Sequence, residues 1–236
     1  MIAAVFGSSG GIGRALVSEL LARGAFTQVF AISRSGAALE GAQARQADCL
    51  DERALAEIAA EISAAGPVTL AIVASGMLSD GAGLQPEKTY RHQSLENFQR
   101  VFEVNTFLPA LIAKHMLPVM PRNQRSVFAA LSARVGSISD NRLGGWHAYR
   151  ASKAALNMLI RNYAIEQARR APDAICIGLH PGTVDTGLSQ AFQSGVVEGK
   201  LFSPQQSARY LLDVIARMTP EDSGKCFDWA GQEVPA

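Results

Sequence analysis

The strongest constraint on the fold comes from a glycine-rich turn near the start of the chain. Residues 7–13 read Gly-Ser-Ser-Gly-Gly-Ile-Gly. They follow an apolar run, 2–6, that predicts a buried strand, and precede a segment with helical periodicity, 14–21. Glycines let the backbone turn tightly and approach a pyrophosphate, and the helix N-terminus then offers free N–H groups. The turn therefore predicts a dinucleotide site.

Strand-like and helical patterns alternate along the rest of the chain. Asp51, Ser94 and Ser203 are expected helix N-caps, and Pro109 a local irregularity. The alternation predicts an α/β fold, a single doubly wound Rossmann domain over residues 1–236, with a parallel sheet of about seven strands and helices on both faces. Strands are expected at 2–6, 27–33, 43–47, 68–73, 126–131, 174–179 and 225–229, and helices at 14–21, 51–64, 94–120, 149–167 and 205–218.

Composition excludes several classes of protein. With 236 residues, 48% of them hydrophobic, the chain can bury a large core, and its net charge of +1 without long basic runs gives no indication of nucleic-acid binding. The three cysteines are far apart, so we expect reduced, buried thiols, no metal site and a cytoplasmic location. No apolar run approaches membrane-spanning length, and no signal peptide is expected.

The residues after the second strand bear on the choice of cofactor. About 20 residues past the last loop glycine, an NAD-binding domain usually carries an acidic residue for the ribose 2′-hydroxyl. Here Ser33 and Arg34 occupy that position. Nothing acidic repels a 2′-phosphate there, and a guanidinium can pair with one, so the sequence favours NADP over NAD.

A second motif, Tyr149-Arg150-Ala151-Ser152-Lys153, opens the fourth predicted helix. Tyr149 and Lys153 stand at i and i+4, so their side chains share one helix face. A nearby ammonium favours the phenolate form, which makes Tyr149 a candidate acid/base group and predicts a lowered phenol pKa. Trp146 and His147, just before the motif, are candidates for lining a substrate pocket.

Taken together, these motifs resemble the short-chain dehydrogenase/reductase family, in the family's order and over nearly the whole chain. Within the family, the segments 131–138 and 144–157 look like the C-factor and sniffer-type carbonyl reductase branch. The shared residues are Gly7-x-x-x-Gly11-x-Gly13, Asp48, Asn105, a serine-bearing segment after the fifth strand, Tyr149-x-x-x-Lys153 and Pro181-Gly182.

The resemblance implies hydride transfer between nicotinamide and a small carbonyl or secondary alcohol substrate. Tyr149 would be the acid/base, Lys153 would hold the nicotinamide ribose, Ser132 would bind the carbonyl oxygen and Asn105 would steady the helix. The cofactor would be NADP, with NAD the less favoured choice. It would be bound by Gly7, Ser9, Gly11, Ile12, Gly13, Ser33, Arg34, Asp48, Cys49, Ala74, Ser75, Gly76, Tyr149, Lys153, Pro181, Gly182, Val184 and Thr186.

The catalytic serine departs from the family pattern. The family's serine lies three residues before the glycine after the fifth strand, and counting back from Gly136 gives Ala133. The hydroxyl is one residue early, at Ser132, and Ser137 is the alternative. On an extended strand a one-residue shift turns a side chain away, although a loop start need not follow that rule.

Other assignments stay open. The displaced serine motivates an alternative, a non-catalytic NADP-binding sensor or C-factor-like signalling protein. A sugar-nucleotide epimerase or dehydratase is less favoured, because few residues follow Pro181-Gly182. Residues 185–203 are the expected substrate-binding loop, and their apolar members, among them Leu188 and Phe192, hint at an apolar carbonyl compound. The resemblance also implies a homodimer or homotetramer.

Overall fold

The computed structural model describes residues 1–79, 83–190, 193 and 199–236. Among these, eight strands form one sheet in the order β10-β9-β6-β5-β4-β1-β2-β3, while β7 pairs with β8 apart from it. The strands are β1 (Ile2–Phe6), β2 (Gln28–Ser33), β3 (Gln43–Gln46), β4 (Val68–Val73), β5 (Ser126–Leu131), β6 (Ala174–His180), β7 (Thr183–Val184), β8 (Leu201–Phe202), β9 (Cys226–Asp228) and β10 (Glu233–Val234).

The predicted doubly wound α/β fold is confirmed, with one difference in strand number. Every pairing in the main sheet is parallel except that of β10 with β9. The described residues thus place seven parallel strands beside one antiparallel edge strand, where about seven strands were predicted. β10 has only two residues, too few for a readable hydrophobic period.

Six α-helices occur in the described residues, and the predicted N-caps Asp51, Ser94 and Ser203 begin three of them. The Asp51 side chain accepts the N–H groups of Arg53 and Ala54, and Ser203 accepts that of Gln206. Short helical turns complete the path, including η1 (Tyr90–His92), η3 (Leu117–Val119), η4 (Arg134–Gly136) and η6 (Pro220–Asp222). The α-helices are α1 (Gly11–Arg23), α2 (Glu52–Ala65), α3 (Leu95–Phe102), α4 (Leu108–Met116), α5 (His147–Ala168) and α6 (Pro204–Arg217).

The long predicted helix 94–120 is divided in the structure. A π-helical turn, η2 (Glu103–Phe107), separates α3 from α4, and Leu108 N–H donates to the Glu103 carbonyl five residues back. Pro109 explains this break because it has no N–H to give the Asn105 carbonyl four residues earlier. The predicted irregularity at Pro109 is therefore confirmed, and it falls beside a predicted site residue.

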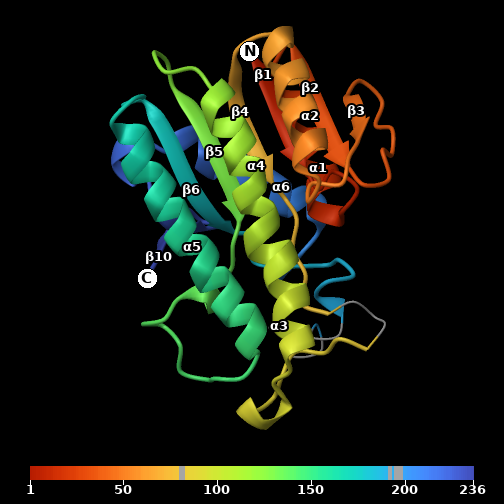
Figure 1. The fold of residues 1–236 in the computed structure, drawn as a ribbon, viewed down its shortest axis with the longest axis vertical. Coiled ribbons are helices and arrows are strands. Elements are labelled where there is room, and N and C mark those ends of the chain that lie inside the picture. The colour runs from red at the N-terminus through yellow and green to blue at the C-terminus, as the bar shows by residue number, and fades with distance from the viewer. Residues whose placement is uncertain (80–82, 191–192, 194–198) are drawn as a thin grey trace.

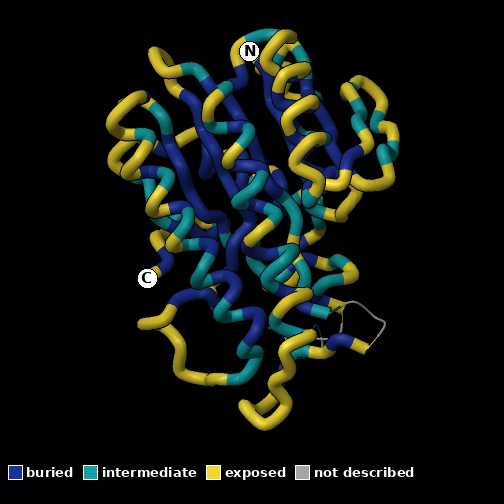
Figure 2. Tube along the Cα trace, in the orientation of Figure 1, coloured by how far each residue is buried: buried dark blue, intermediate teal, exposed yellow. Residues whose placement is uncertain are grey.

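Two apolar layers cover the sheet, one on each face (Figure 1). Side chains of α2, α4 and α5, such as Leu55, Ile112 and Leu156, pack on one face, and side chains of α1 and α6, such as Leu16 and Leu211, pack on the other. The central strands between them, β1, β2, β4, β5 and β6, are mostly buried, while the outer helix faces and loop tips are exposed (Figure 2). Burial on both faces explains why these strands read as continuous apolar runs.

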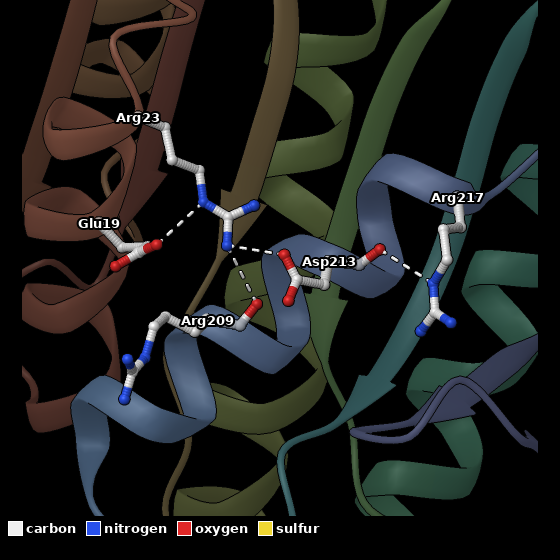
Figure 3. Close-up of polar contacts among 5 residues, drawn as sticks. All are labelled: Glu19, Arg23, Arg209, Asp213 and Arg217. Atoms are coloured by element: carbon white, nitrogen blue, oxygen red, sulfur yellow. Dashed lines mark hydrogen bonds and ion pairs between the residues drawn. The ribbon is translucent and has the colours of Figure 1, made fainter.

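A polar network ties α1 to α6 on the second face (Figure 3). Arg23 donates from Nε to Glu19 (3.0 Å) and from Nη2 to Asp213 (2.8 Å) and to the Arg209 carbonyl (3.3 Å). Arg217 Nε donates to the Asp213 carbonyl at 3.2 Å. The network fixes the two helices that lie behind the glycine turn.

The strand order reverses between β1 and β4, which are hydrogen-bonded neighbours. A crevice forms at such a reversal, at the carboxyl ends of the strands. No helix in the described part of the chain is long and apolar enough to cross a membrane. Cys49, Cys176 and Cys226 are free and buried, as predicted.

Candidate active site

The glycine turn lies at the end of β1, and a Cβ would clash at several of its glycines. A Cβ added at Gly13 would stand 2.2 Å from the Gly7 carbonyl oxygen, and Gly7 itself has a φ of +83°. Ser8 Oγ in the same turn is buried and has no hydrogen-bond partner among the described residues. The α1 N-terminus carries no acidic residue in its first turn. The turn thus leaves backbone N–H groups and a hydroxyl for an anionic ligand.

The residues predicted to bind the far end of the nucleotide gather at the ends of β2 and β3. Arg34 is exposed, and Ser33 Oγ lies 3.3 Å from Ser35 Oγ. Burial raises the pKa of the Cys49 thiol to about 12, and the neighbouring charges of Asp48 and Arg34 act on it in opposite directions. β2 and β3 pair in parallel with Ser33 opposite Gln46, so Arg34, Asp48 and Cys49 follow the same edge of the sheet.

Tyr149 and Lys153 lie on the first turns of α5 and are both buried. Lys153 Nζ lies 5.9 Å from the centre of the Tyr149 ring and donates to the Leu131 carbonyl at 2.7 Å. Burial raises the pKa of Tyr149 to about 12 and lowers that of Lys153 to about 8. The direction is opposite to the lowered phenol pKa that we predicted from Lys153, because burial removes the hydration that would stabilise the phenolate.

Asn105 is fully buried and joins two distant segments. Its Oδ1 accepts the Met77 N–H (2.8 Å), and its Nδ2 donates to the Met77 carbonyl (2.8 Å) and to Ser152 Oγ (3.1 Å). Ser152 Oγ in turn donates to the Tyr149 carbonyl at 2.8 Å. Asn105 therefore clamps the segment after β4 to the helix turn that carries Tyr149.

The serine hydroxyls after β5 make other contacts. Ser132 Oγ donates to Asn157 Oδ1 at 2.6 Å, and Ser137 Oγ accepts the Asp140 N–H at 3.1 Å. Ala133 instead packs in an apolar cluster with Tyr149. Ala133 has extended backbone angles, so its side chain and that of Ser132 point in opposite directions. The Ser132 hydroxyl is thus held by Asn157, whereas the Ala133 methyl group packs against Tyr149.

A cavity of about 510 Å³ brings many of the predicted residues together. It reaches from the α1 N-terminus to Tyr149, and Trp146 lines it as expected, with its ring edge-on to Tyr149 at 6.3 Å. The predicted site residues that line it are Gly11, Ile12, Ala74, Ser75, Gly76, Ser132, Tyr149, Lys153, Pro181, Gly182, Val184 and Thr186.

The other predicted residues do not line this cavity. Gly7 and Gly13 form the turn next to the cavity. Asn105 does not reach the cavity surface and bonds the backbone of Met77 instead. Ser9, Ser33, Arg34, Asp48 and Cys49 lie beyond its lining. In the predicted substrate loop, Leu188 lines the cavity, whereas Phe192, Val196 and Val197 are outside the described residues.

Two residues near the site were not assigned from the sequence. Glu87 is buried, its Oε2 accepts the Ala148 N–H at 3.3 Å, and its carbonyl accepts the Trp146 N–H at 2.6 Å. It supplies the cap that α5 lacks, since Trp146 offers no capping side chain. His180 ends β6 and lines the cavity. His180 could have been found from the sequence, because it stands at a predicted strand end directly before Pro181-Gly182. Glu87 has no such local signal.

Residues 1–196 match the family model described as short chain dehydrogenase. The chain belongs to this family and is a short-chain dehydrogenase/reductase enzyme, as the sequence motifs predicted.

Its curated relatives include the C-signal of Myxococcus xanthus, 37% identical over 136 residues that make up 58% of this chain and 76% of C-signal. They also include 1-hydroxy-2-glutathionyl-2-methyl-3-butene dehydrogenase of Rhodococcus sp., 34% identical over 127 residues, 54% of this chain and 53% of that protein. The C-signal similarity agrees with the predicted C-factor branch.

Solved structures share the fold over the full chain. NADPH-bound carbonyl reductase from chicken fatty liver superposes with a TM-score of 0.84 at 23% identity, covering 100% of this chain and 94% of that one. Carbonyl reductase Sniffer of D. melanogaster superposes with a TM-score of 0.84 at 19% identity, covering 100% and 98%. At these identities the likeness establishes the fold.

Proposed function

We propose that this protein transfers a hydride between NADP(H) and a carbonyl or secondary alcohol substrate, with Tyr149 as the acid/base. The observation that carries the proposal is the shared cavity, in which Tyr149 and Lys153 face the same space as the α1 N-terminus and Pro181-Gly182. A nucleotide held at the glycine turn would therefore extend toward the phenol.

The residues present fit a dinucleotide cofactor. The unpartnered Ser8 hydroxyl and the tight Gly7–Gly13 approach support a pyrophosphate at the α1 N-terminus. Arg34, exposed at the end of β2 and flanked in the sequence by Ser33 and Ser35, supports NADP over NAD, because a guanidinium pairs well with a 2′-phosphate. The NADPH bound to the chicken carbonyl reductase is in keeping with this choice.

The protonation states in the cavity suit reduction. When bound, the reduced nicotinamide supplies a hydride, a proton with two electrons, to the carbonyl carbon. Tyr149, whose pKa of about 12 keeps it protonated at neutral pH, gives its proton to the carbonyl oxygen, and the resulting phenolate regains one from solvent. Lys153 stabilises that phenolate and binds the nicotinamide ribose. Asn105 holds the backbone of Met77, and Ser132 bonds the Asn157 side chain of α5.

The remaining assignments stay predictions. Residues 1–236 act as one domain in the cytoplasm, and residues 185–203 shape a pocket for an apolar carbonyl compound. A homodimer or homotetramer would cover exposed apolar side chains at Phe107 of η2 and at Met158 and Ile165 of α5.

The decisive experiment measures NADPH oxidation over a panel of aldehydes, ketones and quinones, for the native protein and for Tyr149→Phe. Removing the acid/base group should lower kcat by about 10²–10⁴, with NADPH binding largely kept. Tyr163→Phe is the matched control, because Tyr163 is on the same helix but packs on Phe128, away from the cavity. Undiminished turnover in Tyr149→Phe would refute the assignment.

A second candidate, a non-catalytic NADP-binding or signalling protein, is favoured by Ala133 and by the C-signal similarity. Tight NADPH binding with no turnover of any compound in the panel would support this second candidate.

A further inference from the structure

Reduction of a carbonyl places negative charge on its oxygen, and hydrogen-bond donors aimed at that oxygen stabilise the charge. In this cavity Tyr149 is one donor. Ser132 Oγ donates its single proton to Asn157. Lys153 Nζ donates one N–H to the Leu131 carbonyl, and its two other N–H groups are those assigned above to the phenolate and the nicotinamide ribose. Ala133, the residue on the Tyr149 side, has only a methyl group. Candidates for a second donor are therefore the other residues that line the cavity.

His180 lies in the right place to supply it. It is the last residue of β6, and Ser132 N–H donates to the carbonyl of Leu179 at 2.8 Å, so His180 adjoins the Ser132–Ala133 pair. A Cβ added at Gly178, two residues earlier on the strand, would lie 3.4 Å from Asn157 Oδ1. Because side chains two residues apart share a strand face, His180 points toward α5, the helix of Tyr149.

The burial of one ring nitrogen decides which tautomer of His180 is favoured. Nδ1 is buried and has no hydrogen-bond partner among the described residues, while the ring lines the cavity. An N–H at Nδ1 would be buried and unsatisfied, which favours the tautomer with the proton on Nε2. Nε2 then carries the N–H, and because Nδ1 is buried while the ring lines the cavity, we infer that this N–H is the one available to a ligand.

The surroundings keep this imidazole neutral. Burial lowers the pKa of His180 to about 4, against the attraction of the Asp228 carboxylate from β9 and with the repulsion of Arg134 from η4. Asp228 Oδ1 is engaged by the N–H groups of Ala230 and Gln232, both at 2.9 Å, and Arg134 pairs with Asp140. His180 therefore donates one N–H at neutral pH and does not compete with Tyr149 as a proton source.

We propose that His180 is a catalytic residue whose Nε2–H binds the carbonyl oxygen of an aldehyde or ketone substrate alongside the Tyr149 hydroxyl, in the role that a serine hydroxyl at position 133 would fill. This inference rests on the proposed function.

The test compares kcat, KM and NADPH affinity in His180→Leu, which removes the donor, and His180→Gln, which keeps an N–H donor near the same place. Loss of a donor to a developing oxyanion typically costs about 10²-fold in kcat. We expect that loss in His180→Leu, with KM and NADPH affinity within about threefold of native. His180→Gln should keep most of the turnover. His92→Leu, at an exposed histidine of η1, is the control.

A rescue variant separates donation from packing. Adding Ala133→Ser to His180→Leu places a hydroxyl on the Tyr149 side and should restore kcat at least about tenfold toward the native value. Native kcat in His180→Leu, or equal losses in His180→Leu and His180→Gln without rescue by Ala133→Ser, would overturn the proposal while leaving a Tyr149-dependent reductase intact. Absence of native turnover on every panel member would instead overturn the proposed function and this inference with it.

Discussion

Asn105→Ala should destabilise the protein more than any surface substitution on the same helices. The change removes three hydrogen bonds and leaves both backbone groups of Met77 and the Ser152 hydroxyl short of a partner. A net value of about 1 kcal/mol per neutral hydrogen bond, with a further penalty for the stranded partners, gives a loss of about 3–5 kcal/mol. Domains are stable by only about 5–15 kcal/mol, so this is a large fraction of the total.

Urea unfolding followed by tryptophan fluorescence measures the effect, since Trp146 and Trp229 lie near the site. The midpoint should fall with little change in the slope of free energy against urea. Asn162→Ala, an exposed asparagine on α5, is the matched control and should stay within about 0.5 kcal/mol of native. The reasoning is refuted if Asn105→Ala loses less than about 1 kcal/mol.

Two other predictions concern the cofactor and pH. Arg34→Glu should raise the KM for NADPH at least about tenfold while leaving NADH use similar or better, because a carboxylate repels the 2′-phosphate; unchanged NADPH selectivity in steady-state kinetics would contradict it. His180 has a folded pKa of about 4 against an ordinary 6.5, so its contribution to stability is fully present above pH 6.5 and is lost as the pH falls toward 4. It amounts to about 3 kcal/mol. Between pH 7 and pH 4.5, the free energy of unfolding measured in urea should fall less for His180→Gln than for the native protein. Equal decreases would contradict this role of His180.

The order of elements and much of the site could be predicted from the chain alone. The strands at 2–6, 68–73 and 126–131 were placed with the bounds that the structure has, because parallel strands buried on both faces are continuous apolar runs. The caps at Asp51 and Ser203 are local, since a side chain there bonds backbone only two or three residues on. The glycine turn and the Tyr149–Lys153 spacing are equally short-range.

Contacts between residues far apart in the sequence could be found only in the tertiary structure. Ser132 meets Asn157 across 25 residues, Asn105 meets Met77 across 28, and Glu87 caps a helix that begins 60 residues later. The direction of the pKa shift at Tyr149 also could not be predicted from the sequence. Spacing reveals the nearby ammonium of Lys153 but not the loss of water around the phenol, which is set by residues from several elements packed against it. Hydrophobic period and capping are properties of a short segment, whereas burial, and the protonation that follows from it, is a property of the assembled fold.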